Sequence, residues 1–288
     1  MDYEQFICAM SECTKAQLSG DETVEIQRIL KNNGVAMVGL AIRKEGQRIA
    51  PLIYLEGFYE QFLAGESVEN LSHILLNQRE EAPELTNWDY GKIFDFREIK
   101  DRILFKLINT EKNEELLKEV PHIPMLDFSI VFYLMLPTFE EEKGSILVKN
   151  EHCRLWGTDQ AELYECAKEN APKHCPHVFC SLAKFLAIQF LEEVEEEDIF
   201  VLTNEQGVNG AAVVLYPNIL QWVFGKLEGS YYLLPASVHE FLVVPSKRGI
   251  TAEELRTIVR EVNQTQISRE EFLSDDVYLF DGDNITKM

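Results

Sequence analysis

Apolar residues in the first part of the chain switch from helical spacing to extended spacing. In residues 2–18 they recur every three or four positions, which predicts an amphipathic helix. Residues 24–29 then alternate apolar and polar, and an extended pattern resumes at residues 35–42. Residues 32–34 between them read Asn-Asn-Gly, and both residue types tolerate a positive φ. The pattern therefore predicts a helix followed by a β-hairpin.

The middle of the chain predicts several helices around one strongly apolar strand. Leu126–Leu136 is apolar at nearly every position and rich in Ile, Val, Phe and Tyr, which favours a strand buried on both faces. A further helix is expected after Pro176, because proline fits the first helical turn and apolar residues space a buried face to residue 191. Other predicted helices cover residues 55–62, 68–76, 113–119 and 159–170, and short strands are predicted at 103–108 and 145–149.

The last part of the chain mixes neighbouring strands with helices. Predicted strands cover residues 199–203, 211–216, 231–234, 241–244 and 277–280, and predicted helices cover 217–226 and 251–262. Thr251 and Glu254 form a capping-box pattern at the start of the last helix. Hairpin strands mixed with helices predict an α+β fold with mixed, mainly antiparallel sheets and flanking helices. We expect two lobes, residues 1–120 and 121–288.

The charge of the chain limits its partners. It has 49 acidic and 27 basic residues and a formal net charge of −22, which repels phosphate backbones and anionic lipid headgroups. General nucleic-acid binding and membrane association are therefore not expected, whereas a basic protein partner is compatible. The longest apolar run, residues 130–136, is too short to span a bilayer, and the first residues lack a secretory signal pattern. We expect a cytoplasmic protein whose six cysteines are reduced.

Three polar residues lie close together in the apolar stretch 233–245. Ser237, His239 and Glu240 include the residue types of a nucleophile, a base and an orienting acid. On an extended strand Ser237 and His239 share a face, but Glu240 points to the opposite one, so it does not orient the imidazole without a bend. The Gly-x-Ser-x-Gly elbow of hydrolases is also missing. A polar start to a core strand is therefore favoured over catalysis at these weak candidates.

Thiols and imidazoles gather in a second place. His174, Cys175, His177 and Cys180 follow one another closely, and Cys166 lies shortly upstream. On the helix predicted after Pro176, His177 and Cys180 would share a face and could form half of a zinc site. The paired Cys-x2-Cys spacing of structural zinc sites is absent. No cofactor is therefore predicted, and zinc at these five weak candidates is the minor alternative.

The glycine-containing segment 204–210 does not have the pattern of a phosphate-binding loop. It reads Asn-Glu-Gln-Gly-Val-Asn-Gly and matches neither G-x-x-x-x-G-K-[ST] nor G-x-G-x-x-G. Asn209 and Gly210 are typical of a tight turn, because both accept a positive φ. If the protein has a site, this turn and the face of Ser237 and His239 are the places where we expect it.

The order and spacing of several short motifs resemble a large family of uncharacterised bacterial proteins, common in gut Firmicutes, catalogued only as a domain of unknown function. The resemblance covers most of the chain and implies no catalytic residue. Its motifs are Val120-Pro121-His122, Leu126-Asp127-Phe128-Ser129-Ile130-Val131-Phe132, Asn150-Glu151-His152, Trp156-Gly157, Leu202-Thr203-Asn204, Asn209-Gly210-Ala211-Ala212, Leu234-Pro235-Ala236-Ser237-Val238-His239-Glu240 and Leu273-Ser274-Asp275-Asp276-Val277-Tyr278.

The sequence predicts a non-enzymatic binding or regulatory module. This prediction follows from the acidic composition and from the missing catalytic signatures. The alternative is a serine-type hydrolase that uses Ser237 and His239 with an acid from elsewhere in the fold. The relation of these two side chains in space separates the two hypotheses.

Overall fold

The computed structural model describes residues 1–18, 20–45, 50–81, 90–136, 144–190 and 199–288. Contacts within the chain group it into two units. Unit 1 comprises residues 1–31, 35–94 and 137–144, and unit 2 comprises residues 32–34, 95–136 and 145–288. The lobe boundary that we expect at residue 120 lies inside unit 2. Whether residues 1–120 and 121–288 fold separately stays a prediction.

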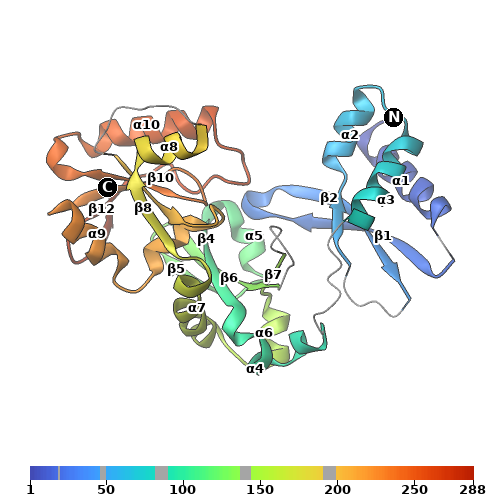
Figure 1. Ribbon diagram of the computed structural model, residues 1–288, viewed down its shortest axis with the longest axis horizontal. Helices are drawn as coiled ribbons and strands as arrows, with labels where there is room; N and C mark the ends of the chain where they lie inside the picture. Colours follow the sequence, from blue (N-terminus) through green and yellow to red (C-terminus); the bar gives the residue numbers. More distant parts are fainter. Residues whose placement is uncertain (19, 46–49, 82–89, 137–143, 191–198) are drawn as a thin grey trace. The chain divides into compact units, whose positions relative to one another are not determined.

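The described part of unit 1 is an antiparallel sheet with helices packed against it (Figure 1). The predicted hairpin is confirmed, with nine residue pairs between its strands. Its strands are β1 (Glu22–Leu30) and β2 (Ala36–Lys44), and β2 also pairs with β3 (Leu52–Tyr54). The helices are α1 (Tyr3–Gln17), α2 (Glu56–Leu63) and α3 (Val68–Glu81).

The core of unit 1 lies between the helices and one face of the sheet. Phe6 and Met10 of α1 are fully buried together with Leu40 of β2 and Leu71 of α3. The helix α1 begins at Asp2, whose carboxylate accepts a hydrogen bond from the main-chain N–H of Gln5 in a capping box. These residues confirm the helical spacing predicted for residues 2–18.

Unit 2 contains a six-stranded antiparallel sheet in the order β13-β12-β10-β11-β9-β8. Strands β10 and β11 form a hairpin, and so do β12 and β13. The turn at residues 281–284 is closed by the Asp281 carboxylate, which accepts from two main-chain N–H groups. The strands are β8 (His177–Ser181), β9 (Phe200–Asn204), β10 (Tyr231–Pro235), β11 (Phe241–Pro245), β12 (Tyr278–Phe280) and β13 (Ile285–Lys287).

Alternate residues of this sheet pack against helices on opposite faces. Leu234 and Val244 contact Leu255 of the last helix, α10 (Ala252–Thr265). Tyr231 points to the other face, where Phe280 meets the ring of Phe224 from α9 (Ile219–Leu227). Side chains alternate between faces along a strand, so each residue's parity decides which helix it contacts. The central strands are therefore apolar on both faces.

A second sheet of unit 2 is built around β6, the apolar strand that the sequence predicts at residues 126–136. It pairs with β4 on one side and with β5 and β7 on the other. Phe105 of β4 packs against Tyr164 and Tyr216. The strands are β4 (Ile103–Asn109), β5 (His122–Met125), β6 (Phe128–Met135) and β7 (Ser145–Leu147).

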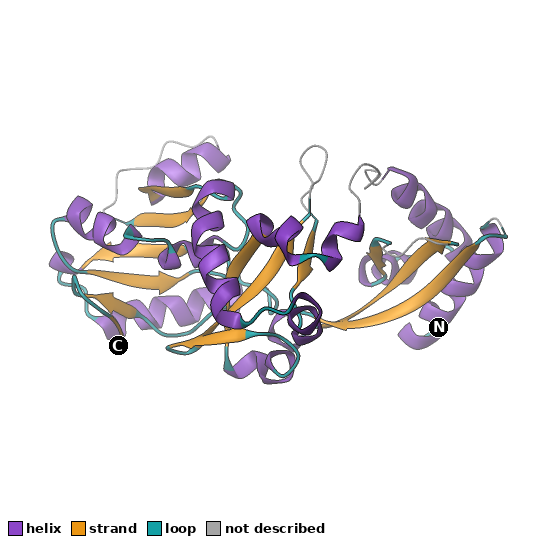
Figure 2. Ribbon diagram, turned by 90° about the horizontal axis from the view of Figure 1, so that it is seen from below, coloured by secondary structure: helices purple, strands orange, loops and turns teal. Residues whose placement is uncertain are grey.

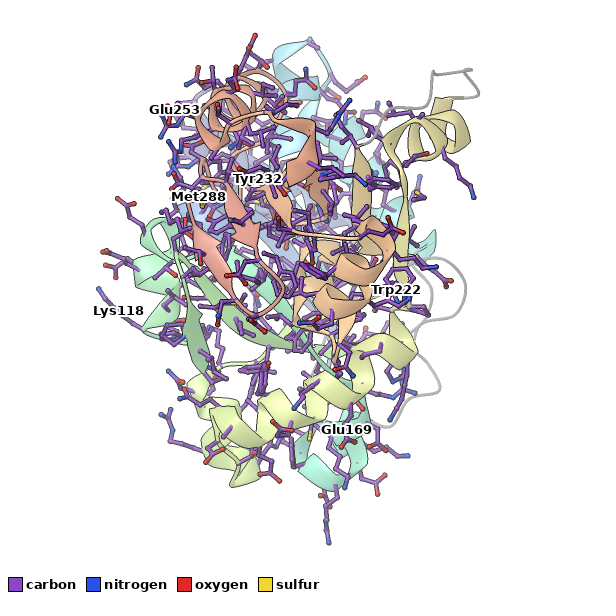
Figure 3. All side chains as sticks on the ribbon, turned by 90° about the vertical axis from the view of Figure 1, so that its left-hand side faces the viewer. Lys118, Glu169, Trp222, Tyr232, Glu253 and Met288 are labelled. Carbon is purple, nitrogen blue, oxygen red and sulfur yellow. The ribbon has the colours of Figure 1, made fainter. Side chains whose placement is uncertain are left out.

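Helices cover the faces of both unit 2 sheets (Figure 2), and charged side chains such as those of Lys118, Glu169 and Glu253 project outward from them (Figure 3). The described helices of unit 2 other than α9 and α10 are α4 (Phe96–Ile99), α5 (Glu114–Leu117), α6 (Asn150–Trp156), α7 (Gln160–His174) and α8 (Leu182–Phe190). The α+β class and the predominance of antiparallel pairing are confirmed.

Asparagine side chains hold the segment 268–274 of unit 2 by its main-chain carbonyls. The amide of Asn33 donates to the carbonyls of Arg269 and Phe272, at 2.9 and 2.7 Å. Asn113 in turn donates to the Asn33 carbonyl at 2.9 Å. The two bonds from Asn33 satisfy main-chain carbonyls that lie outside any strand pairing. The other donors are Asn32 to Glu270, Asn109 to Leu273 and Asn263 to Ser274.

Two predicted elements are wrong. Residues 177–181 form β8 and pair with β9, and the helix predicted from Pro176 begins only at Leu182. Residues 210–215 form buried 3-10 turns in place of the strand predicted at 211–216. Short apolar runs do not distinguish a strand from a buried helical turn by periodicity, which explains both errors.

Candidate functional site

The candidate Ser237 lies in the loop that joins β10 to β11. The strand assumed for it ends at Pro235, and the next begins at Phe241. The Ser237 hydroxyl donates to Glu240 Oε1 at 2.7 Å and accepts from the main-chain N–H of His239 at 2.9 Å. Because the loop bends, Glu240 turns back to Ser237, which corrects the expectation that it points away. The serine is 4% exposed, so its hydroxyl is enclosed within its own loop.

The imidazole of His239 bonds to other parts of unit 2. Its Nδ1 accepts from the main-chain N–H of Asn209 at 3.1 Å, and its Nε2 lies 3.6 Å from Glu271 Oε1. The accepting Nδ1 indicates that a neutral ring carries its proton on Nε2, facing the carboxylate. The imidazole is therefore not arranged to take a proton from Ser237.

The 204–210 turn packs directly against this loop, so the two places singled out in the sequence come together. Asn209 has the predicted positive φ, 54°. A Cβ on Gly210 would overlap the Thr203 hydroxyl and the His239 carbonyl, which explains why glycine is needed there. The Thr203 hydroxyl donates to the same His239 carbonyl at 2.7 Å. These bonds fix a turn against a loop and leave the polar atoms of the loop internally satisfied.

The histidine and cysteine candidates for zinc are spread over the helix α7, the strand β8 and the connection between them. Cys166 lies within α7, whereas His177 and Cys180 lie on β8, where a separation of three residues points them to opposite faces. The shared helical face expected for this pair is therefore wrong. His174 Nε2 bonds to the Asp101 carbonyl at 2.8 Å, and Cys175 is buried. No group of three or more His, Cys, Asp or Glu residues within the described ranges is placed to hold a metal ion.

Burial raises the pKa of the Cys166 and Cys180 thiols. The thiol form is then favoured over the thiolate that binds zinc. Zinc binding stays the minor alternative to the prediction of no cofactor, and metal analysis of chelator-washed protein tests it. One equivalent lost in a Cys175→Ala/Cys180→Ala variant would support it, and wild-type protein without metal would contradict it.

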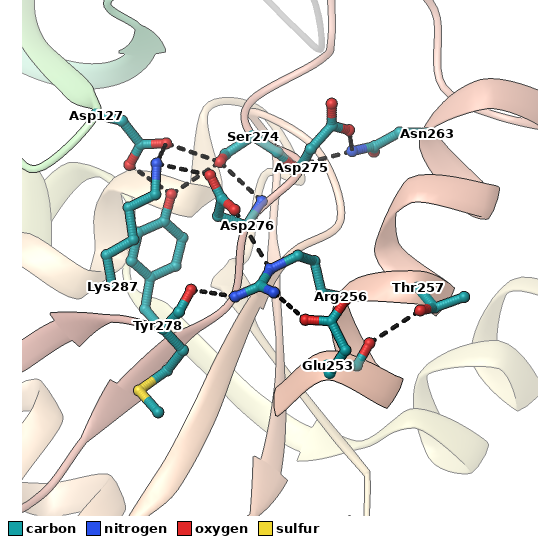
Figure 4. A network of polar contacts seen from close by, with 11 residues as sticks. Asp127, Glu253, Arg256, Thr257, Asn263, Ser274, Asp275, Asp276, Tyr278 and Lys287 are labelled. Atoms are coloured by element: carbon teal, nitrogen blue, oxygen red, sulfur yellow. Dashed lines mark hydrogen bonds and ion pairs between the residues drawn. The ribbon is translucent and has the colours of Figure 1, made fainter. Parts of the chain in front are cut away.

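Sequence reasoning missed a polar cluster around Asp127 (Figure 4). Asp127 occupies the two-residue turn between β5 and β6, next to Leu126, whose φ is 57°. Its carboxylate accepts from the Tyr278 hydroxyl at 2.5 Å and from the Ser274 hydroxyl at 2.9 Å. Tyr278 and Ser274 are 1% and 2% exposed, so both donors are fixed by their surroundings. The cluster joins the turn of one sheet to a strand of the other.

A lysine lies between two carboxylates at the outer side of this cluster (Figure 4). Lys287 Nζ is 2.6 Å from Asp276 Oδ2 and 3.3 Å from Asp127 Oδ2. Asp276 also faces Arg256 Nε at 3.4 Å, and its main-chain N–H donates to the Ser274 hydroxyl. The carboxylate side chains are 24% exposed and the lysine side chain is 42% exposed. Lys287 thus lies in a slot between two carboxylates that reaches solvent.

Burial and hydrogen bonding in this slot shift the pKa of two of its groups. Burial, and then the hydrogen bond to Asp127, raise the pKa of Tyr278 far above its usual value. The hydrogen bond to Asp276 raises the pKa of Lys287. The tyrosine therefore stays a neutral donor and the lysine stays a cation at neutral pH. Neither group is arranged as a general base.

The signal that could have found the slot is weak. Asp127 and the segment 273–278 belong to motifs that carry the family resemblance, but they are far apart in the chain. The bond between Ser274 and Asp127 spans 147 positions. A lone aspartate in a turn is usually a local hydrogen-bond acceptor, so nothing in the sequence pairs it with Tyr278.

A family model matches residues 3–282, nearly the whole chain, and its description is a family of unknown function, DUF5688. The protein belongs to DUF5688. Comparisons with curated proteins and with solved structures find no match. The membership confirms the resemblance to a domain of unknown function, while the bacterial origin stays a prediction. The DUF5688 match encloses Asp127 and the segment 273–278 and ends before β13.

One further finding concerns the helices of the DUF5688 protein. Within the ranges that the structure describes, none combines the length and the apolar character needed to cross a bilayer.

Proposed function

We propose that this protein is a non-enzymatic binding module whose acidic surface receives a basic segment of a protein partner. The observation that carries the proposal is the internal bonding of the catalytic candidates. Ser237 bonds to Glu240 and His239 bonds to Asn209, so neither group is held ready for a substrate. A serine-type hydrolase is therefore not favoured.

The composition supports the chemistry of the partner. A net charge of −22 attracts cationic segments and speeds their encounter, while it repels nucleic acids. All six cysteines are free, which supports a reducing, cytoplasmic setting. No cofactor is part of the proposal.

Binding to an array of synthetic ten-residue peptides tests the proposal. We expect the wild-type protein to bind lysine-rich and arginine-rich peptides at 50 mM NaCl and to release them at 500 mM, because screening weakens charge-driven association. Peptides with glutamate in place of each basic residue are the matched control. Equal binding to both sets would contradict the proposal.

A fluorophosphonate probe tests the hydrolase directly. We expect no labelling of Ser237, because its hydroxyl is buried and bonded within the loop. Labelling of the wild type that disappears in Ser237→Ala would replace the binding proposal with an esterase or related activity. Ser268→Ala, at an exposed serine with the same local bonding pattern, is the control for unspecific labelling.

A further inference from the structure

The strand β13 contributes little burial to unit 2. It pairs with β12 through three residues, in the register Tyr278↔Lys287 to Phe280↔Ile285. Ile285 is half-buried, while Thr286 and Lys287 are exposed. In contrast, Tyr278 and Phe280 of β12 are buried, Tyr278 against Phe128 of β6 and Phe280 against Tyr231 of β10 and Phe224 of α9. The edge of β12 is thus held firmly from one side, and β13 lies on it as an outer strand.

The acceptors for Lys287 are positioned by groups outside β13. Asp127 is held by Tyr278 and Ser274, and Asp276 is held by its own main-chain bond to Ser274 and by Arg256. None of these three residues, Tyr278, Ser274 and Arg256, belongs to β13. The residues that position both carboxylates therefore lie outside β13, and such preorganisation favours binding.

The ion pairs of Lys287 orient β13 but stabilise its pairing with β12 only weakly. Exposed ion pairs contribute little to stability. Arg256 also donates to the Met288 carbonyl, next to β13. The tether through residues 281–284 raises the local concentration of β13 and keeps it in place. A strand held mainly by its tether can be exchanged for a similar strand of another chain.

We propose that the edge of β12, with Asp127 and Asp276, is the binding site for an extended, lysine-bearing segment of a protein partner, and that β13 occupies this site within the chain until the partner strand displaces it. The inference rests on the proposed function and names its site. The partner adds a strand by main-chain hydrogen bonds, and its lysine, opposite Tyr278, enters the slot.

Fluorescence polarisation with a labelled peptide, Asn-Ile-Thr-Lys-Met, tests the exchange. We expect weak binding to the wild type and at least threefold tighter binding to Lys287→Ala, whose own strand competes less. The peptide Asn-Ile-Thr-Glu-Met should bind at least tenfold more weakly to Lys287→Ala. Equal affinity of the lysine peptide for the wild type and Lys287→Ala would overturn the proposal.

Substitutions of the slot carboxylates provide a second test of the proposed site. In the Lys287→Ala background, Asp276→Asn should weaken peptide binding about threefold. Asp275→Asn is the matched control, because Asp275 is exposed and bonds to Asn263 instead of Lys287. Equal effects of the two substitutions would overturn the proposal.

A reducible disulfide between β12 and β13 distinguishes strand exchange from an effect of misfolding. Leu279 and Thr286 face each other across β12 and β13, so Leu279→Cys/Thr286→Cys can join the strands. The oxidised variant should not bind the peptide, and reduction should restore binding. Binding to the oxidised, disulfide-joined protein would overturn the exchange.

The two proposals can fail separately. If basic peptides bind the wild type in a salt-sensitive way but Asp276→Asn does not change peptide affinity, the proposed function is supported and this binding site is contradicted. If no basic peptide binds the wild type or Lys287→Ala, both proposals fall.

Discussion

At the scale of single residues, Ser237 supports its loop through two hydrogen bonds. Replacing it with alanine leaves the His239 N–H and the Glu240 carboxylate without this partner inside a closed loop. We expect Ser237→Ala to lower the free energy of unfolding by about 1–3 kcal/mol, measured by urea denaturation. Ser268→Ala removes similar bonds at an exposed position and should cost about 0.5 kcal/mol or less. Equal costs would contradict the structural role of Ser237.

Tyr278 predicts a loss of stability in alkali. Burial and then the bond to Asp127 raise its pKa, so the folded protein holds the phenol proton more tightly than the unfolded chain does. The stability from this linkage is complete below the unfolded value, about 10, and falls as the pH rises above it. The pH dependence of the urea midpoint between pH 8 and 11 measures this fall.

Tyr278→Phe checks the assignment of the alkaline effect. It removes the hydroxyl that donates to Asp127 and Ser274, so we expect about 1–3 kcal/mol less stability at pH 7. Above pH 10 its stability should fall less steeply than that of the wild type. Tyr232→Phe is the control, because the Tyr232 hydroxyl forms no hydrogen bond within the described ranges. An unchanged slope in Tyr278→Phe would contradict the assignment.

Residue patterns revealed the Ser237 loop but not its purpose. The sequence shows three polar residues in an apolar stretch, and the structure bonds them to each other and to the 204–210 turn. The slot at Asp127 was not predicted, because Asp127 and Tyr278 are 151 positions apart and periodicity carries no information about such pairs.

At the scale of elements, the 204–210 turn depends on the absence of a side chain at Gly210. An added Cβ would meet the His239 carbonyl and the Asn204 main-chain nitrogen, which cannot rotate away. We expect Gly210→Ala to lower the free energy of unfolding by about 1–3 kcal/mol or to prevent folding. Gly225→Ala in α9 meets nothing within 4 Å and should be neutral or stabilising, by up to about 1 kcal/mol. Thermal unfolding compares them, and a stable Gly210→Ala protein would contradict the close packing.

Elements with their own local signals were predictable. Thr251 caps the start of the helix α10. Its side chain accepts a hydrogen bond from the main-chain N–H of Glu254 in the predicted capping box. The strand β5 was not predicted. It lies at the edge of its sheet beside β6, where a proline such as Pro124 is tolerated. Residues 177–181 became a strand because β9 offered a pairing edge, which local spacing does not encode.

At the scale of the whole molecule, the acidic excess predicts a stabilising effect of salt. A net charge of −22 makes the compact chain repel itself, and at 0.1 M ionic strength screening acts beyond about 10 Å. Raising NaCl from 20 to 300 mM should therefore raise the urea midpoint, although it weakens surface ion pairs worth about 0–1 kcal/mol each. A falling midpoint would show that the ion pairs outweigh the repulsion.

The asparagine side chains that hold segment 268–274 also bear on the timing of folding. Asn33 and Phe272 are 239 positions apart, so a ribosome adding about 5–20 residues per second makes them on the order of ten seconds or more apart. Until then the hydrogen bonds from the Asn33 amide to Arg269 and Phe272 cannot form. The assembly of unit 2 is thus a late event in synthesis, and chaperones have a long interval in which to meet the incomplete chain.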